Sequence, residues 1–112
     1  MKAAWYQTQE KEHKTQHHRS RDMIQITYSN DRLEIKGHSG YAPIGQDIIC
    51  SAVTILWRTL VDDLNPKDYS EEPGHSVINY EGLIHQRPFQ TILRGFKLLD
   101  RECGQYVSVK KV

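Results

Sequence analysis

The chain has 112 residues and a mass of 13.1 kDa, which is the size of one domain. Its residues are 38% hydrophobic, which excludes a wholly disordered chain, and no apolar run reaches the roughly 20 residues that span a bilayer. Fifteen lysines and arginines against 14 aspartates and glutamates give a net charge of +1, which argues against a dedicated nucleic-acid-binding face.

Residues 1–20 are predicted to form a flexible polar extension. Residues 7–20 contain no hydrophobic side chain, so this segment has nothing to bury and cannot offset its ordering entropy. It carries His13, His17 and His18, which lack a fourth ligand and are interpreted as part of a solvated tail. Because no secretory signal is visible and the two cysteines are too few for a disulfide scaffold, we expect a cytoplasmic protein with reduced thiols.

The folded domain is expected to span residues 21–112 and to begin with a β-hairpin. Residues 23–28 are rich in β-forming side chains, and turn residues follow at 29–31. Leu33 and Ile35 then alternate with charged neighbours, which is the period of two of a half-exposed strand.

A helix is predicted after a glycine-bearing loop, with Asp47 as its N-cap. Apolar residues recur there at intervals of three and four, as on one face of a helix, at Ile49, Ala52, Val53, Leu56 and Leu60. Trp57 falls off this stripe and is interpreted as an exposed residue that contacts a second copy or a substrate. The helix should stop before Pro66, and residues 65–74 are predicted to be a loop.

Three further elements complete the domain. A third strand is predicted over residues 75–80, extended by residues 83–85 through a bend at Gly82, and a closing strand is predicted over residues 106–110. Between them lies a second helix, whose apolar face is formed by Phe89, Ile92, Leu93, Phe96 and Leu99.

The predicted order β-β-α-β-(β)-α-β indicates an α+β fold, a two-layer sandwich in which two helices cover one face of a mostly antiparallel sheet. Such a core is small and the other sheet face needs cover. We therefore expect a homodimer.

One stretch carries residues suited to nucleophilic catalysis. Cys50 lies in the first turn of the predicted helix, where the helix dipole stabilises a thiolate. His38 precedes it by twelve residues, and an imidazolium beside the thiol would lower its pKa further and later donate a proton to a leaving amine. Amides of the first turn are candidates to stabilise an oxyanion. In the simpler alternative, Cys50 is a small buried core residue.

The sequence GHSGYAPIGQDIICSAVTIL, residues 37–56, resembles the signature of the ribosomal-processing cysteine proteases, the Prp family. The resemblance extends over residues 23–112 and implies that Cys50 is the nucleophile and His38 the catalytic histidine. The implied supporting residues are Asp47, Ser51 and Thr54. The implied substrate loop contains Gly37, Ser39, Gly40, Tyr41, Ala42 and Gly45.

The family resemblance also implies an activity and partners. The expected activity is that of a homodimeric cysteine endopeptidase, without metal or organic cofactor, that removes a short N-terminal extension from a bacterial large-subunit ribosomal protein. A phage-encoded member would act on a capsid precursor instead. Two features depart from the family pattern, namely Thr54 in place of a serine and the polar extension over residues 1–20.

Several alternatives stay open at this stage. Asp47 either caps the helix, which we favour, or orients His38 as the third member of a triad. The main rival function is a non-enzymatic, ribosome- or RNA-associated dimeric binding module that would use the polar extension over residues 1–20 and the basic residues Lys36, Arg58, Arg87 and Arg94. A second rival is a thiol-dependent redox or acyl-transfer protein. Cys103 is expected to be a buried apolar residue.

Overall fold

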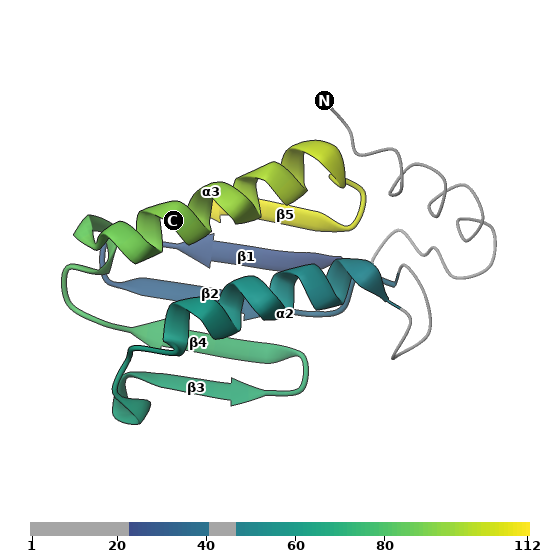
Figure 1. Cartoon of the computed structure of the whole chain (residues 1–112). Helices are drawn as coiled ribbons and strands as arrows, with labels where there is room; N and C mark the ends of the chain where they lie inside the picture. Colours follow the sequence, from purple (N-terminus) through teal and green to yellow (C-terminus); the bar gives the residue numbers. More distant parts are fainter. Residues whose placement is uncertain (1–22, 41–46) are drawn as a thin grey trace.

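The structure is a computed structural model of the chain and describes residues 23–40 and 47–112 (Figure 1). The predicted extension over residues 1–20, with its three histidines, lies outside the described residues, as do the predicted loop residues Tyr41, Ala42 and Gly45. The described elements form an α+β fold, as predicted.

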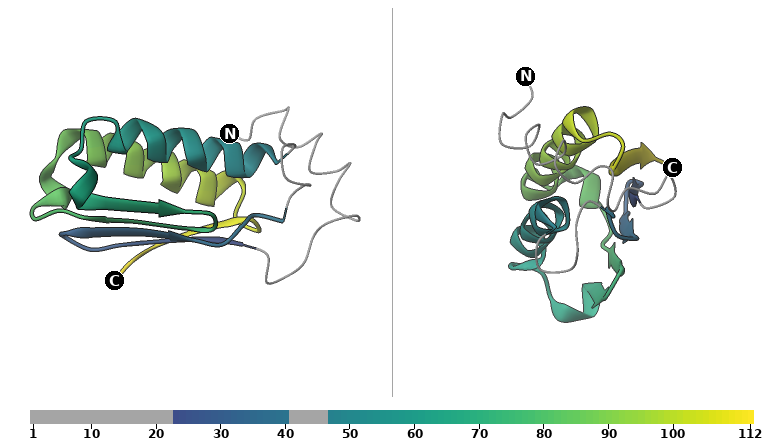
Figure 2. Two further views of the ribbon diagram at one scale, coloured as in Figure 1. Left: turned by 90° about the horizontal axis from the view of Figure 1, so that it is seen from below. Right: turned by 90° about the vertical axis from the view of Figure 1, so that its right-hand side faces the viewer.

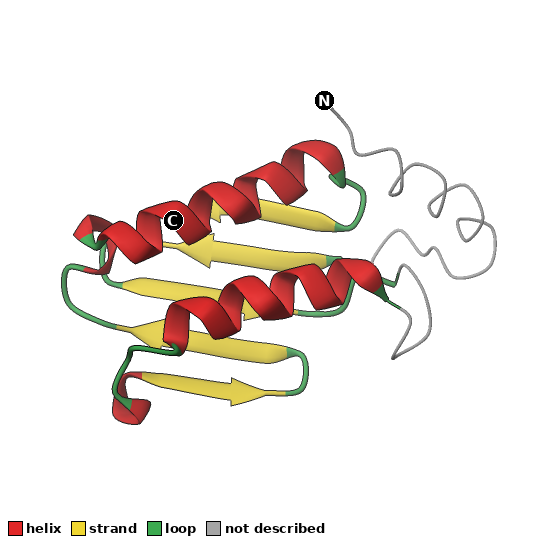
Figure 3. Ribbon diagram, in the orientation of Figure 1, coloured by secondary structure: helices red, strands yellow, loops and turns green. Residues whose placement is uncertain are grey.

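The sheet has five strands in the order β3-β4-β2-β1-β5 (Figure 3). The strands are β1 (Ile24–Tyr28), β2 (Arg32–Lys36), β3 (Tyr69–Glu72), β4 (His75–Asn79) and β5 (Val107–Lys111). β1 and β2 form the predicted hairpin, in which Ile26 pairs with Ile35. Three of the four strand pairs are antiparallel, whereas β1 and β5 are parallel, with Ile24 opposite Val107. The sheet is therefore mixed but mostly antiparallel.

Two helices, α2 (Ile48–Val61) and α3 (Arg87–Glu102), cover one face of the sheet, so the predicted two-layer arrangement is confirmed (Figure 2). They pack closely, since a Cβ atom added at Gly95 would lie 3.0 Å from Cδ2 of Leu56. Within the described ranges, neither helix is long and apolar enough to cross a membrane.

The predicted loop over residues 65–74 was wrong, because it contains a short 3-10 helix, η1 (Pro66–Asp68), and strand β3. The polar sequence of β3 concealed it. β3 lies at the edge of the sheet and buries little, apart from the ring of Tyr69, which packs edge-on against Trp57 with ring centroids 6.2 Å apart.

The predicted extension of the third strand over residues 83–85 was also wrong. These residues form a 3-10 helix, η2 (Leu83–His85). Gly82 turns the chain with a φ of 76°, and its N–H donates to the Asp31 side chain at 2.8 Å. This turn takes the chain away from the hydrogen bonds between β4 and β2. The optional strand of the predicted order was placed after β4, whereas the structure has its additional strand, β3, before β4.

Trp57 is a core residue, which corrects its interpretation as an exposed interface residue. Its side chain is only 3% exposed, and its Nε1–H donates to Oε1 of Glu71 at 2.8 Å. The buried stripe of α2 runs through Ile49, Val53 and Trp57 at intervals of four, then to Leu60. Leu56, which the sequence analysis placed on that stripe, faces α3 instead.

The open face of the sheet is polar. Ile24, Ile26 and Tyr28 point into the core, so Gln25 and Thr27 face the other way. In the neighbouring strands, Glu34 lies at the centre of three basic side chains: its Oε2 is 3.6 Å from Arg32, 3.8 Å from Lys36 and 2.7 Å from His75. This face is therefore polar and can remain in contact with water. The expectation that a second copy must cover it to bury apolar residues is not supported by its composition.

Candidate active site

The start of α2 is built around Asp47, and the predicted N-cap is confirmed. Asp47 has an extended backbone, and its Oδ1 accepts a hydrogen bond of 2.9 Å from the N–H of Cys50. The N–H of Ser51 donates to the Asp47 carbonyl at 3.1 Å. These two first-turn amides are thus already occupied, so any stabilisation of an oxyanion by the first turn would have to come from its other amides.

The end of β2 brings His38 to the same region. Gly37 has a φ of +94°, and a Cβ atom there would lie 2.5 Å from the carbonyl oxygen of Met23, so only glycine fits. Its N–H donates to the carbonyl of Gly74 at 2.9 Å, which ties the strand end to the turn between β3 and β4. The side chain of His38 follows and is solvent-exposed.

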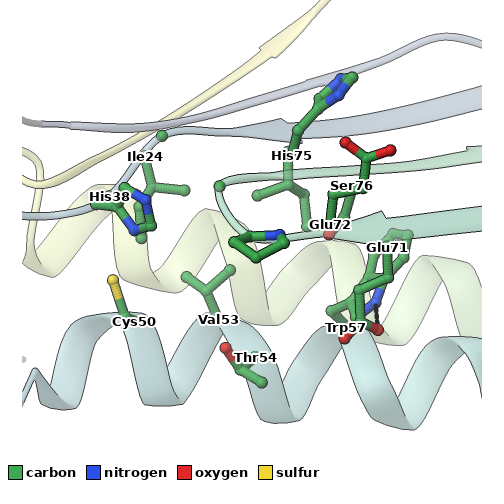
Figure 4. Close-up of a pocket in the computed structure, with 14 residues that line it drawn as sticks. Ile24, His38, Cys50, Val53, Thr54, Trp57, Glu71, Glu72, His75 and Ser76 are labelled. Carbon is green, nitrogen blue, oxygen red and sulfur yellow. Dashed lines mark hydrogen bonds between the residues drawn. The ribbon is translucent and has the colours of Figure 1, made fainter. Parts of the chain in front are cut away.

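His38 and Cys50 line one pocket of about 300 Å³ between α2 and the β3–β4 hairpin. The sulfur of Cys50 points toward the side of the pocket on which the His38 ring lies (Figure 4). The apolar lining consists of Ile24, Ile35, Val53 and Trp57 together with Pro73. The pocket therefore combines a thiol, an imidazole and an apolar wall.

The environment of Cys50 disfavours the thiolate in this structure. Partial burial is the largest influence and raises the pKa of the Cys50 thiol. The N–H of Ser39, which donates to the sulfur at 3.5 Å, opposes this rise, whereas the nearby Asp47 carboxylate adds to it. The pKa of the thiol is therefore raised, whereas the sequence analysis expected it to be lowered, and burial is the main cause, with the charge of the helix cap Asp47 adding to it.

Of the other predicted site residues that the structure describes, some line the pocket and others lie outside it. Thr54 lines the pocket one turn beyond Cys50, whereas Ser51 is exposed outside it and bonds to the Asp47 carbonyl through its hydroxyl. Ser39, expected in the substrate loop, is fully buried, and Gly40 has a φ of 68°. The two oxygens of Asp47 bond to Ser39 and to Cys50 instead of orienting His38.

The hairpin wall of the pocket was missed by the sequence analysis, which treated these residues as loop. Pro73 and Gly74 form the turn, and a Pro-Gly pair between β-forming segments is a known turn signal. His75 follows on β4, where its Nε2 bonds to Glu34, and this bond is the main reason why the pKa of Glu34 is lowered. His75 therefore borders the pocket, but its ring lies on the open face of the sheet and points away from Cys50, whereas the ring of His38 lies on the side of the thiol (Figure 4).

Of the basic residues of the rival binding module, Lys36 lies on the opposite side of the sheet from the three that the helices carry. Lys36 lies on the open sheet face beside Glu34, whereas Arg58 on α2 pairs with Glu71 at 2.6 Å. Arg87 and Arg94 lie on α3. Among the described residues no group of three potential ligands is placed to hold a metal ion. Cys103 is buried in the core, as expected.

Comparison with known proteins identifies a family for this arrangement. The sequence model of the family described as Cysteine protease Prp matches residues 23–108. No curated protein matches the sequence significantly.

Three solved structures share the fold. An essential ribosomal processing protease Prp from S. aureus with a covalently linked product peptide has a TM-score of 0.71 at 17% identity, covering 80% of this chain and 100% of that one. The same protease with a substrate peptide gives 0.66 at 16% identity, with the same coverage of 80% and 100%. SMU.848 from Streptococcus mutans gives 0.65 at 25% identity, covering 81% and 95%.

Proposed function

The chain belongs to the cysteine protease Prp family, and we propose that it is an endopeptidase in which Cys50 is the nucleophile and His38 the general base and acid. The observation that carries this proposal is that the thiol and the imidazole line the same pocket, although they come from a helix start and a strand end. Residues 21–112 would form the protease domain, and residues 1–20 an extension to it.

The chemistry follows from the raised pKa of the thiol. Because burial raises the pKa of the Cys50 thiol, the thiol proton passes to His38 as the sulfur attacks the carbonyl carbon of the scissile peptide bond. His38 then gives the proton to the leaving amine as the C–N bond breaks, which leaves a thioester on Cys50. Water attacks the thioester with loss of a proton to His38, the acid product leaves, and the sulfur recovers the proton.

Three further residues are proposed to support these steps. Asp47 holds the first turn that presents Cys50, and Ser51 bonds to the Asp47 carbonyl from the next position. Thr54 places a hydroxyl on the pocket wall one turn from the thiol. Substrate would bind along the loop that contains Gly37, Gly40, Tyr41, Ala42 and Gly45.

The substrate class is proposed from the relatives. The S. aureus structures are of a ribosomal processing protease, one of them with a substrate peptide. By analogy, this chain would remove a short N-terminal extension from a large-subunit ribosomal protein, as a homodimer in the cytoplasm. A phage capsid precursor is the second substrate to test.

The decisive experiment is to incubate the protein with the extended ribosomal protein of its host and to map the products by mass spectrometry. We expect a single cut near the N-terminus, which Cys50→Ala abolishes and Cys103→Ala leaves in place, because Cys103 lies in the core away from the pocket. A cut that persists in Cys50→Ala, or no cut of either precursor, would refute the proposal.

A further inference from the structure

Ser39 follows His38 in the chain but does not line the pocket. Its side chain is 0% exposed, and its hydroxyl lies between two partners. It accepts from the Cys50 thiol at 3.7 Å and donates to Oδ2 of Asp47. Its backbone N–H donates to the same sulfur at 3.5 Å. Ser39 thus contacts the candidate nucleophile through both its main chain and its side chain.

Asp47 completes this arrangement. Its side chain is 7% exposed, and a carboxylate so far buried needs hydrogen-bond donors. One donor is the Ser39 hydroxyl and the other is the N–H of Cys50, at 2.9 Å. Through these bonds, the strand end that carries His38 and the helix start that carries Cys50 meet on one carboxylate.

The two contacts of Ser39 with sulfur suit its two protonation states. A thiol donates a weak hydrogen bond, which the Ser39 hydroxyl accepts, whereas a thiolate only accepts, and the Ser39 N–H supplies the donor. A sulfur that loses and regains a proton in each catalytic cycle would therefore have a partner at every stage.

Resting on the proposed protease function, we propose that Ser39 is a positioning residue that holds the Cys50 sulfur in place through both protonation states and keeps the Asp47 carboxylate on the helix start. In this role Ser39 does not contact substrate. Its removal should slow the chemical step and leave substrate binding unchanged.

The test compares Ser39→Ala with Ser39→Thr, which keeps the hydroxyl, in the full-length protein. The first readout is kcat and KM for cleavage of the precursor. We expect Ser39→Ala to lower kcat about tenfold, with little change in KM, because the loss of one hydrogen bond in a protein typically has an effect of this size. Ser39→Thr should restore most of kcat. A wild-type kcat in Ser39→Ala overturns the proposal.

The second readout is the pH dependence of Cys50 alkylation by iodoacetamide, with the modified peptide identified by mass spectrometry. The titratable groups around the sulfur are Asp47, which bonds to the N–H of Cys50, and the residues that line the same pocket, namely His38, Glu71, Glu72 and His75. Ser39→Ala keeps the N–H donor to the sulfur but removes the hydroxyl, which leaves the Asp47 carboxylate with one hydrogen-bond donor fewer. The negative charge of Asp47 raises the pKa of the Cys50 thiol, so we expect the alkylation midpoint of Ser39→Ala to move to higher pH. An unchanged midpoint counts against the proposal.

Alkylation does not depend on proteolysis, so the two proposals can fail separately. If the wild type cleaves neither precursor, the proposed protease function is refuted, and the midpoint of Cys50 alkylation still tests whether Ser39 positions the sulfur. If Ser39→Ala does not fold, the alkylation midpoints of Asp47→Asn and Ser39→Thr test the proposed role of Ser39 instead. We expect Asp47→Asn to move the midpoint to lower pH and Ser39→Thr to keep it, and the absence of a shift in Asp47→Asn overturns the proposal.

Discussion

Gly74 lies directly behind the ring of His38: a Cβ atom added to this glycine would be 3.0 Å from Nε2. The N–H of Gly37, one residue before His38, also donates to the Gly74 carbonyl at 2.9 Å. The turn of the β3–β4 hairpin therefore limits both the backbone and the ring of the candidate base.

Gly74→Ala should displace this ring and lower kcat/KM by more than its effect on stability explains. Gly82→Ala is a matched control, because Gly82 has nearly the same φ, 76° against 75°, but has no atom within 4 Å of its added Cβ. Both variants should lose about 1 kcal/mol of the free energy of unfolding, since alanine is strained at positive φ. Urea denaturation and cleavage kinetics check this, and equal activity in the two variants would contradict it.

His38→Gln should lower kcat/KM by roughly 10²–10⁴-fold, the usual contribution of a general base. His75→Gln provides the comparison, because His75 borders the same pocket but its ring points away from Cys50 and bonds to Glu34 on the open face of the sheet. We expect a much smaller loss for His75→Gln. Steady-state kinetics on the purified variants measure both, and a larger loss at His75 would reassign the base.

The raised pKa of Cys50 has a consequence for stability. The folded chain holds the thiol proton more tightly than the unfolded chain, so this contribution to stability is complete below the ordinary thiol pKa and is lost as the pH rises through the folded-state value. The free energy of unfolding should therefore fall more steeply at alkaline pH for the wild type than for Cys50→Ala. Parallel pH profiles in urea denaturation would speak against this.

Glu71 fastens the edge strand β3 to α2, because its two oxygens accept from Trp57 at 2.8 Å and from Arg58 at 2.6 Å. Trp57→Phe keeps most of the apolar contact but removes the buried donor, and should cost about 1–3 kcal/mol of the free energy of unfolding. Arg58→Gln should cost less, about 0–1 kcal/mol, because that pair is exposed. Thermal and urea unfolding test the ranking, and a larger loss at Arg58 would reverse it.

Local patterns were sufficient for most of the elements. The alternation at Leu33 and Ile35 predicted β2, and the apolar stripes predicted both helices, because these periods report which side of one element is buried. The N-cap at Asp47 followed from its side chain and its position, since capping involves only residues of the same turn.

The features that needed the tertiary structure depend on residues far apart in the chain. β3 is polar because it lies at a sheet edge, and Trp57 is buried because β3 covers it, so neither could be read from its own neighbours.

The chemistry divides in the same way. The sequence alone was enough to single out His38, Cys50 and Asp47, whose types and spacing suit thiol catalysis. Only the folded chain decided that Gly74 would lie beside the ring of His38 and that Ser39 would bond to the sulfur. It also decided that burial, with the Asp47 charge, would raise the pKa of the Cys50 thiol. The pKa of a buried group depends on every charge and dipole around it, and folding brings these together.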